Sequence, residues 1–89
     1  DLSALKTALL VRDLGSFAAV ARLLDLDASS VSRVIAQLEQ DVGFRLFQRS
    51  TRSLAPTGEG ELYLNRIAPL VEELEAAGDE ARTTAVSPR

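Results

Sequence analysis

The fold of this chain is decided by residues 16–42, which read SFAAVARLLDLDASSVSRVIAQLEQDV. The first part predicts a helix over 17–25, for which Ser16 is a suitable N-cap. The second part predicts a helix over 28–41 that begins after Asp27. Apolar residues recur along one face of this second helix at i, i+4, i+7 and i+11: Val31, Ile35, Leu38 and Val42. Both helices are therefore expected to be amphipathic and to pack on a common core.

Two short helices joined by a turn of about three residues form a helix-turn-helix, whose second helix can enter the major groove of DNA. The face of helix 28–41 opposite its apolar residues carries small or basic side chains: Ser29, Ser32, Arg33 and Ala36. Small side chains permit a close approach to the groove, and arginine can bond to guanine through two hydrogen bonds. Solvated helix faces have a similar composition, so these residues alone leave both interpretations open.

Residues on either side predict a small helical domain. A helix is expected over 3–14, ended by Gly15. Residues 44–56 predict a two-stranded hairpin with the polar tip Arg49-Ser50-Thr51-Arg52. Such a basic hairpin can contact phosphate or the minor groove, although a basic tip is also common on solvated loops.

Thr57 is a suitable N-cap for a long helix predicted over 58–82, in which Pro69 predicts a kink or a break. Its apolar stripe is longer than a small core can cover, which favours a seam between two copies over packing within one domain. The residues assigned to this dimer interface are Leu64, Ile67, Leu70, Val71 and Leu74. An acidic face on the same helix is expected to point to solvent.

Composition excludes several classes of protein. The chain has 89 residues, a net charge of −3, and neither cysteine nor histidine, which removes disulfides, thiolate metal sites and the commonest general base. No glycine-rich phosphate loop or nucleophile elbow is present, so neither an enzyme nor a cofactor nor a metal site is expected. No leader or membrane-spanning run is apparent, which indicates a cytoplasmic protein. Residues 28–57 hold four arginines against two carboxylates, a local net charge of +2 that suits a polyanion.

The ordered motifs across residues 2–65 resemble the N-terminal winged helix-turn-helix domain of the LysR-type transcriptional regulators. The residues that carry the resemblance are, in order, Gly15-Ser16-Phe17, Val20-Ala21 with Leu24, Val31-Ser32-Arg33, Ile35, Leu38-Glu39, Val42-Gly43, Leu46-Phe47-Gln48-Arg49, and Thr57 with Gly60. It implies a mainly α fold with a three-helix core and a short β wing over residues 1–58, with the helix-turn-helix at 17–41 and the wing at 44–56. A linker helix for dimerisation would occupy residues 58–82.

The resemblance also implies a function and a set of site residues. The domain would bind double-stranded DNA as a homodimer on an interrupted inverted repeat. The family's DNA-facing positions fall on Ala28, Ser29, Ser30, Ser32, Arg33, Arg49, Thr51 and Arg52. A small-molecule effector would bind only through a C-terminal domain absent from this chain. Residues 83–89 would be a disordered tail or the start of the hinge to that domain.

Two departures from the family pattern concern base recognition. Ala28 and Val34 stand where the family often has glutamine, so two groups able to bond to base edges are missing. We therefore expect recognition through thymine methyl groups, phosphates and DNA shape. The alternative function is a winged helix that binds protein through the acidic fourth helix.

Overall fold

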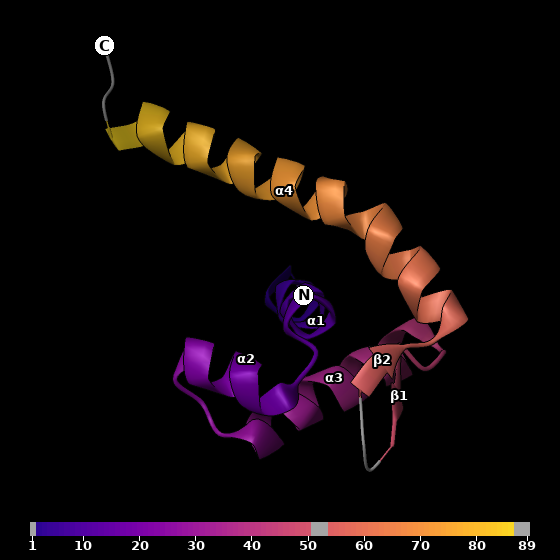
Figure 1. Ribbon diagram of the computed structural model, residues 1–89. Helices are drawn as coiled ribbons and strands as arrows, with labels where there is room; N and C mark the ends of the chain where they lie inside the picture. The colour runs from indigo at the N-terminus through magenta and orange to yellow at the C-terminus, as the bar shows by residue number, and fades with distance from the viewer. Residues whose placement is uncertain (1, 51–53, 87–89) are drawn as a thin grey trace.

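The structure is a computed structural model that describes residues 2–50 and 54–86 (Figure 1). Three short helices, a two-stranded hairpin and one long helix follow each other along the chain. Their bounds are α1 Leu2–Leu14, α2 Phe17–Leu24, α3 Ala28–Val42, β1 Phe47–Arg49, β2 Leu54–Pro56 and α4 Gly58–Val86. The predicted winged helix-turn-helix is confirmed, with α2 and α3 as its two helices.

The helix ends follow the caps expected from the sequence. The Ser16 side chain accepts a hydrogen bond from the backbone N–H of Ala19 at 3.1 Å, and Asp27 accepts one from the N–H of Ser30 at 2.7 Å. Asp25 ends α2 in the left-handed region, with φ of 60°. The turn between α2 and α3 is thus fixed by a polar residue at each side of Leu26.

One hydrophobic core joins the three short helices, β1 and the first half of α4. Its buried members are Ala8, Val11, Val20, Ala21, Val31, Ile35, Leu38, Leu46, Phe47, Leu64, Ile67 and Val71. The apolar face predicted for the second helix of the motif lies in this core, with Val42 half-buried at its end. Burial of that face leaves the opposite side of α3 in solvent.

The wing, defined here as residues 44–56, contains the predicted antiparallel hairpin. Phe47 pairs with Pro56, Gln48 with Ala55, and Arg49 with Leu54. Of the tip residues assigned to DNA, Thr51 and Arg52 lie outside the described residues. The wing therefore places Arg49 at the end of β1, next to the tip.

The long helix α4 is continuous through Pro69 and runs to Val86. The ribbon curves but does not break, and its C-terminal half extends away from the helix-turn-helix (Figure 1). Of the kink or break predicted at Pro69, the break is therefore absent. Residues 83–86 of the predicted tail are helical, and residues 87–89 lie outside the described residues. Within the described ranges, no helix combines the length and apolarity required to cross a bilayer.

Candidate nucleic-acid interface

The first turn of α3 is held by a small polar network. Asp27 accepts hydrogen bonds from the Ser29 hydroxyl at 2.9 Å and from the backbone N–H of Ser30 at 2.7 Å. The Ser30 hydroxyl in turn accepts a hydrogen bond from Arg33 Nη2 at 3.3 Å. These contacts orient Arg33 along the N-terminal end of the helix, where a recognition helix meets base edges.

The pKa of Asp27 is lowered by this network. Hydrogen bonds from the side chain and the backbone of Ser30 make the largest contributions, followed by the Ser29 hydroxyl, and the charge of Arg33 adds to them. These partners favour the ionised carboxylate, which also suits the N-terminus of a helix. The cap is therefore charged near neutral pH.

The α3 residues predicted to contact DNA differ in their exposure to solvent. Ala28, Ser29 and Arg33 are exposed, whereas Ser30 and Ser32 are half-buried. Gln40 shares the exposed face one turn beyond Ala36 and was not predicted. Its place in the 3.6-residue period, four residues after Ala36, is the signal that could have found it. The five α3 residues predicted to face DNA therefore differ in how much of each side chain is exposed.

The Arg49 side chain contacts two other residues of its own chain, Phe17 and Glu39. Its guanidinium lies 5.4 Å from the centre of the Phe17 ring, and its Nη2 is 3.4 Å from Glu39 Oε1. The Phe17 contact has the geometry of a cation–π interaction. Arg49 thus connects the wing with the start of α2 and with α3.

Glu39 is the residue that sequence reasoning missed. Its side chain is only 7% exposed. Its Oε2 accepts hydrogen bonds from the backbone N–H groups of Leu46 at 2.8 Å and Phe47 at 3.2 Å. Apart from the two arginines that follow Glu39, Arg45 and Arg49, no pattern in the sequence indicates these contacts, because hydrogen bonds to backbone groups do not depend on residue type.

The residues assigned to the dimer interface fall into two groups. Leu64, Ile67 and Val71 are 0%, 9% and 3% exposed, because they pack in the core of their own domain. They are therefore not available for the seam that the sequence predicted. Leu70 and Leu74 are 51% and 60% exposed and remain available to a second chain.

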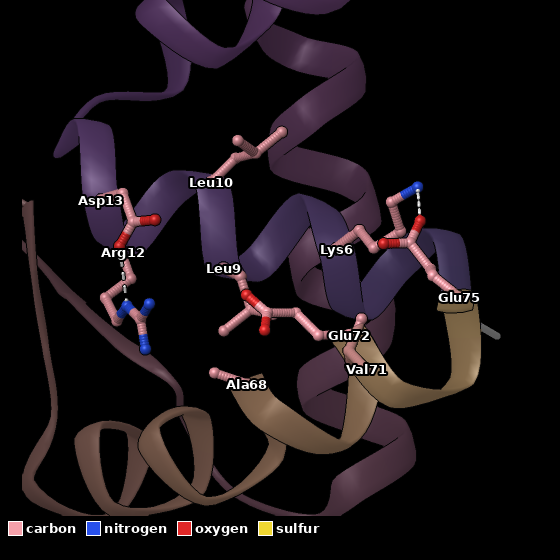
Figure 2. Close-up of a pocket in the computed structure, with 9 residues that line it drawn as sticks. All are labelled: Lys6, Leu9, Leu10, Arg12, Asp13, Ala68, Val71, Glu72 and Glu75. Carbon is pink, nitrogen blue, oxygen red and sulfur yellow. Dashed lines mark hydrogen bonds and ion pairs between the residues drawn. The ribbon is translucent and has the colours of Figure 1, made fainter. Parts of the chain in front are cut away.

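Helices α1 and α4 lie against each other around Val71. Leu9 and Leu10 of α1 line a groove together with Ala68 and Val71 of α4 (Figure 2). An ion pair between Lys6 and Glu75 closes one end of the groove, as the figure shows. At the other end, Arg12 donates a hydrogen bond to the side-chain oxygen of Asn65 at 3.1 Å. One side of α4 is thus covered by α1.

Comparisons with known proteins agree with this architecture. Residues 2–61 match the model of the family described as bacterial regulatory helix-turn-helix protein, lysR family. The uncharacterised HTH-type transcriptional regulator y4mQ of Sinorhizobium fredii is 44% identical over 83% of this chain and 25% of its own length. The HTH-type transcriptional regulator CrgA of Neisseria meningitidis is 39% identical over 74% of this chain and 22% of its own length. The chain thus spans about a quarter of the length of these curated relatives.

A solved structure agrees in both fold and sequence. The chain superimposes on the DNA-binding domain of CbnR, crystallised as a complex with DNA, with a TM-score of 0.85 and 29% identity. The match covers 96% of this chain and 98% of that one. Both of these curated relatives are named as HTH-type transcriptional regulators. The chain belongs to the lysR family of bacterial regulatory helix-turn-helix proteins and is a winged helix-turn-helix DNA-binding domain of that family.

Proposed function

We propose that this domain binds double-stranded DNA in a sequence-specific manner, with α3 in the major groove. The observation that carries the proposal is the exposed face of α3, where Ala28, Ser29 and Arg33 stand together and no carboxylate occurs between Asp27 and Glu39. Arg33 can bond to guanine, and small neighbours permit a close approach. The DNA complex of the similar CbnR domain supports this assignment.

The half-buried serines have a supporting role in this proposal. Ser30 accepts the hydrogen bond from Arg33, so it orients that guanidinium, and Ser32 would lie at the edge of the surface that contacts DNA. Thr51 and Arg52 would contact the backbone or the minor groove from the wing tip. Because Ala28 and Val34 offer no hydrogen-bonding group, thymine methyl groups and DNA shape would carry much of the specificity.

We further propose that two domains pair through α4 and bind an interrupted inverted repeat. Leu70 and Leu74 are large, exposed and one turn apart, which suits a helix–helix seam. Pairing fixes the distance between the two α3 helices, so half-sites would be separated by whole turns of DNA. A small-molecule effector would act through a further domain, and the protein would work in the cytoplasm.

The experiment that tests DNA binding is a fluorescence-anisotropy titration of generic duplex DNA at about 50 and 200 mM salt. Phosphate contacts release counterions, so affinity should fall steeply with salt. The logarithm of the association constant should fall against the logarithm of salt concentration with a slope of about −0.9 per contact. No binding at either salt by a folded dimer would reject the proposal. It would favour the protein-interaction alternative, for which the acidic side of α4 is the next surface to probe.

A further inference from the structure

We propose that Glu39 is a positioning residue for DNA binding, which sets the place of the wing relative to α3. It acts through the start of β1 and through Arg49, and its own carboxylate does not touch DNA. The inference rests on the DNA binding proposed above, and it assigns to Arg49 a supporting role in place of the direct DNA contact that the family resemblance implies.

The carboxylate of Glu39 divides its two oxygens between two kinds of partner. Oε2 accepts from the N–H groups of Leu46 and Phe47, where the chain enters β1. Oε1 lies 3.4 Å from Arg49 Nη2 and 3.6 Å from Arg45 Nε. A carboxylate that is 7% exposed requires such compensation, because an unpaired buried charge is costly. Helix α3 and β1 are therefore held at a fixed separation by one side chain.

The two arginines on this carboxylate differ in their freedom. The Arg49 side chain is 32% exposed and lies against the Phe17 ring as well as Glu39. The Arg45 side chain is 61% exposed, and its Nε is further from the carboxylate. Moving Arg49 onto a phosphate would break two contacts and weaken the compensation of a buried charge. Arg49 is thus suited to join α2, α3 and β1 rather than to bind phosphate.

This arrangement matters for DNA because the wing and α3 must reach the duplex together. When two contact surfaces are held rigidly at the correct separation, the second contact costs little additional entropy. A negative charge near DNA opposes binding electrostatically, so charge alone predicts tighter binding when Glu39 is neutralised. Positioning predicts weaker binding, and the sign of the change separates the two effects.

The test compares Glu39→Gln with Asp41→Asn by anisotropy titration of duplex DNA at about 50 and 200 mM salt. Both variants remove one negative charge from α3 and keep the side-chain shape. Asp41 differs from Glu39 in that it is exposed and accepts a hydrogen bond from Gln37, a residue of the same helix. We expect Glu39→Gln to bind roughly ten-fold more weakly, a change equivalent to one charge-assisted hydrogen bond. Asp41→Asn should bind as tightly as the wild type or more tightly. Equal or tighter binding by Glu39→Gln overturns the inference.

The variant Arg49→Ala tests the contact between Glu39 and Arg49 independently. A supporting role lowers affinity and leaves the salt dependence unchanged, whereas loss of a phosphate contact reduces the salt slope by about 0.9. The double variant Glu39→Gln/Arg49→Ala should lose no more affinity than the stronger single variant, since both break one connection. A reduced slope, or additive losses, contradicts the role given to Arg49.

Folding and function are separated by two further measurements. Amide hydrogen exchange in the free protein should be faster at Leu46 and Phe47 in Glu39→Gln, and unchanged exchange there overturns the inference without DNA. If Glu39→Gln does not fold, Phe17→Leu serves as a second variant, because it removes the ring that contacts Arg49. It should weaken DNA binding without changing the salt slope, and unchanged affinity would overturn the inference. A wild-type domain that fails to bind DNA rejects the proposed function itself.

Discussion

A methyl group on the Cα of Gly60 would lie 2.1 Å from the carbonyl oxygen of Leu46, so the first turn of α4 and the entry to β1 touch with no space for a side chain. The same carbonyl accepts a hydrogen bond from the N–H of Thr57 at 2.9 Å, and the N–H of Leu46 donates to Glu39. Both backbone groups of Leu46 thus connect α3 with the start of α4. The position of the long helix is set at this residue.

Gly60→Ala should therefore destabilise the domain by about 1–3 kcal/mol, the usual cost of overpacking against backbone that cannot move. Urea unfolding followed by circular dichroism measures the change. Gly58→Ala is the matched control, since a methyl group there meets nothing within 4 Å. The control should be neutral or slightly stabilising. Equal stability of the two variants would show that α4 can shift away from Leu46.

Asp25→Gly should stabilise the domain by about 0.5–1 kcal/mol, because Asp25 holds φ of 60° at the end of α2, where glycine meets no steric penalty. The change also removes a negative charge from a helix C-terminus. Thermal unfolding measures the gain. Asp25→Ala removes the same charge but keeps the Cβ, so it should give a smaller gain or none. Equal gains from both variants would assign the effect to charge.

The lowered pKa of Asp27 predicts a pH dependence of stability. A carboxyl group whose pKa is lower in the folded than in the unfolded protein stabilises the fold above its ordinary value of 3.8, and this contribution disappears as the pH falls through the folded pKa. The wild type should therefore exceed Asp27→Asn in stability at pH 5–7, and the difference should shrink below pH 4. Unfolding curves across this range provide the measurement. A difference in stability between the two proteins that does not change with pH would contradict the titration of Asp27.

Arg33→Ala should lower affinity for a selected operator by about 1–3 kcal/mol and relax specificity at one base position, as for an arginine that contacts a base. Binding-site selection followed by anisotropy on operator and scrambled duplexes measures both effects. Arg82→Ala, in the exposed C-terminal half of α4, is the control for loss of one positive charge. Equal loss on both duplexes would place Arg33 on phosphate instead.

Leu74→Glu should reduce dimer formation without unfolding the domain, because Leu74 is 60% exposed. Val71→Glu should unfold it, because the new carboxylate would be buried in the core without a partner. Sedimentation over a range of concentrations and thermal unfolding separate these outcomes. Leu23→Glu changes an equally exposed leucine on α2 and should leave assembly intact. A dimer that persists in Leu74→Glu would exclude this residue from the seam.

Local patterns in the sequence were sufficient for much of the fold. The caps at Ser16, Asp27 and Thr57 and the spacing of Val31, Ile35 and Leu38 predicted where helices begin and which face of α3 is buried. Such features depend on neighbours within about one helical turn, so they can be predicted from the sequence. The Thr57 hydroxyl, for example, accepts from the N–H of Gly60 at 2.9 Å.

The tertiary structure decided what depends on distant partners. The apolar stripe of α4 favoured a seam between two chains, and only the tertiary packing showed that Leu64, Ile67 and Val71 belong to the domain's own core. Likewise, the separation in sequence between Glu39 and Arg49 contains no information on their distance in space. The helices, their caps and the family could be read from the sequence, because these features depend on residues close together in the chain. Which charges are buried and which leucines stay exposed became clear only in three dimensions, because burial is set by contacts between segments far apart in the chain.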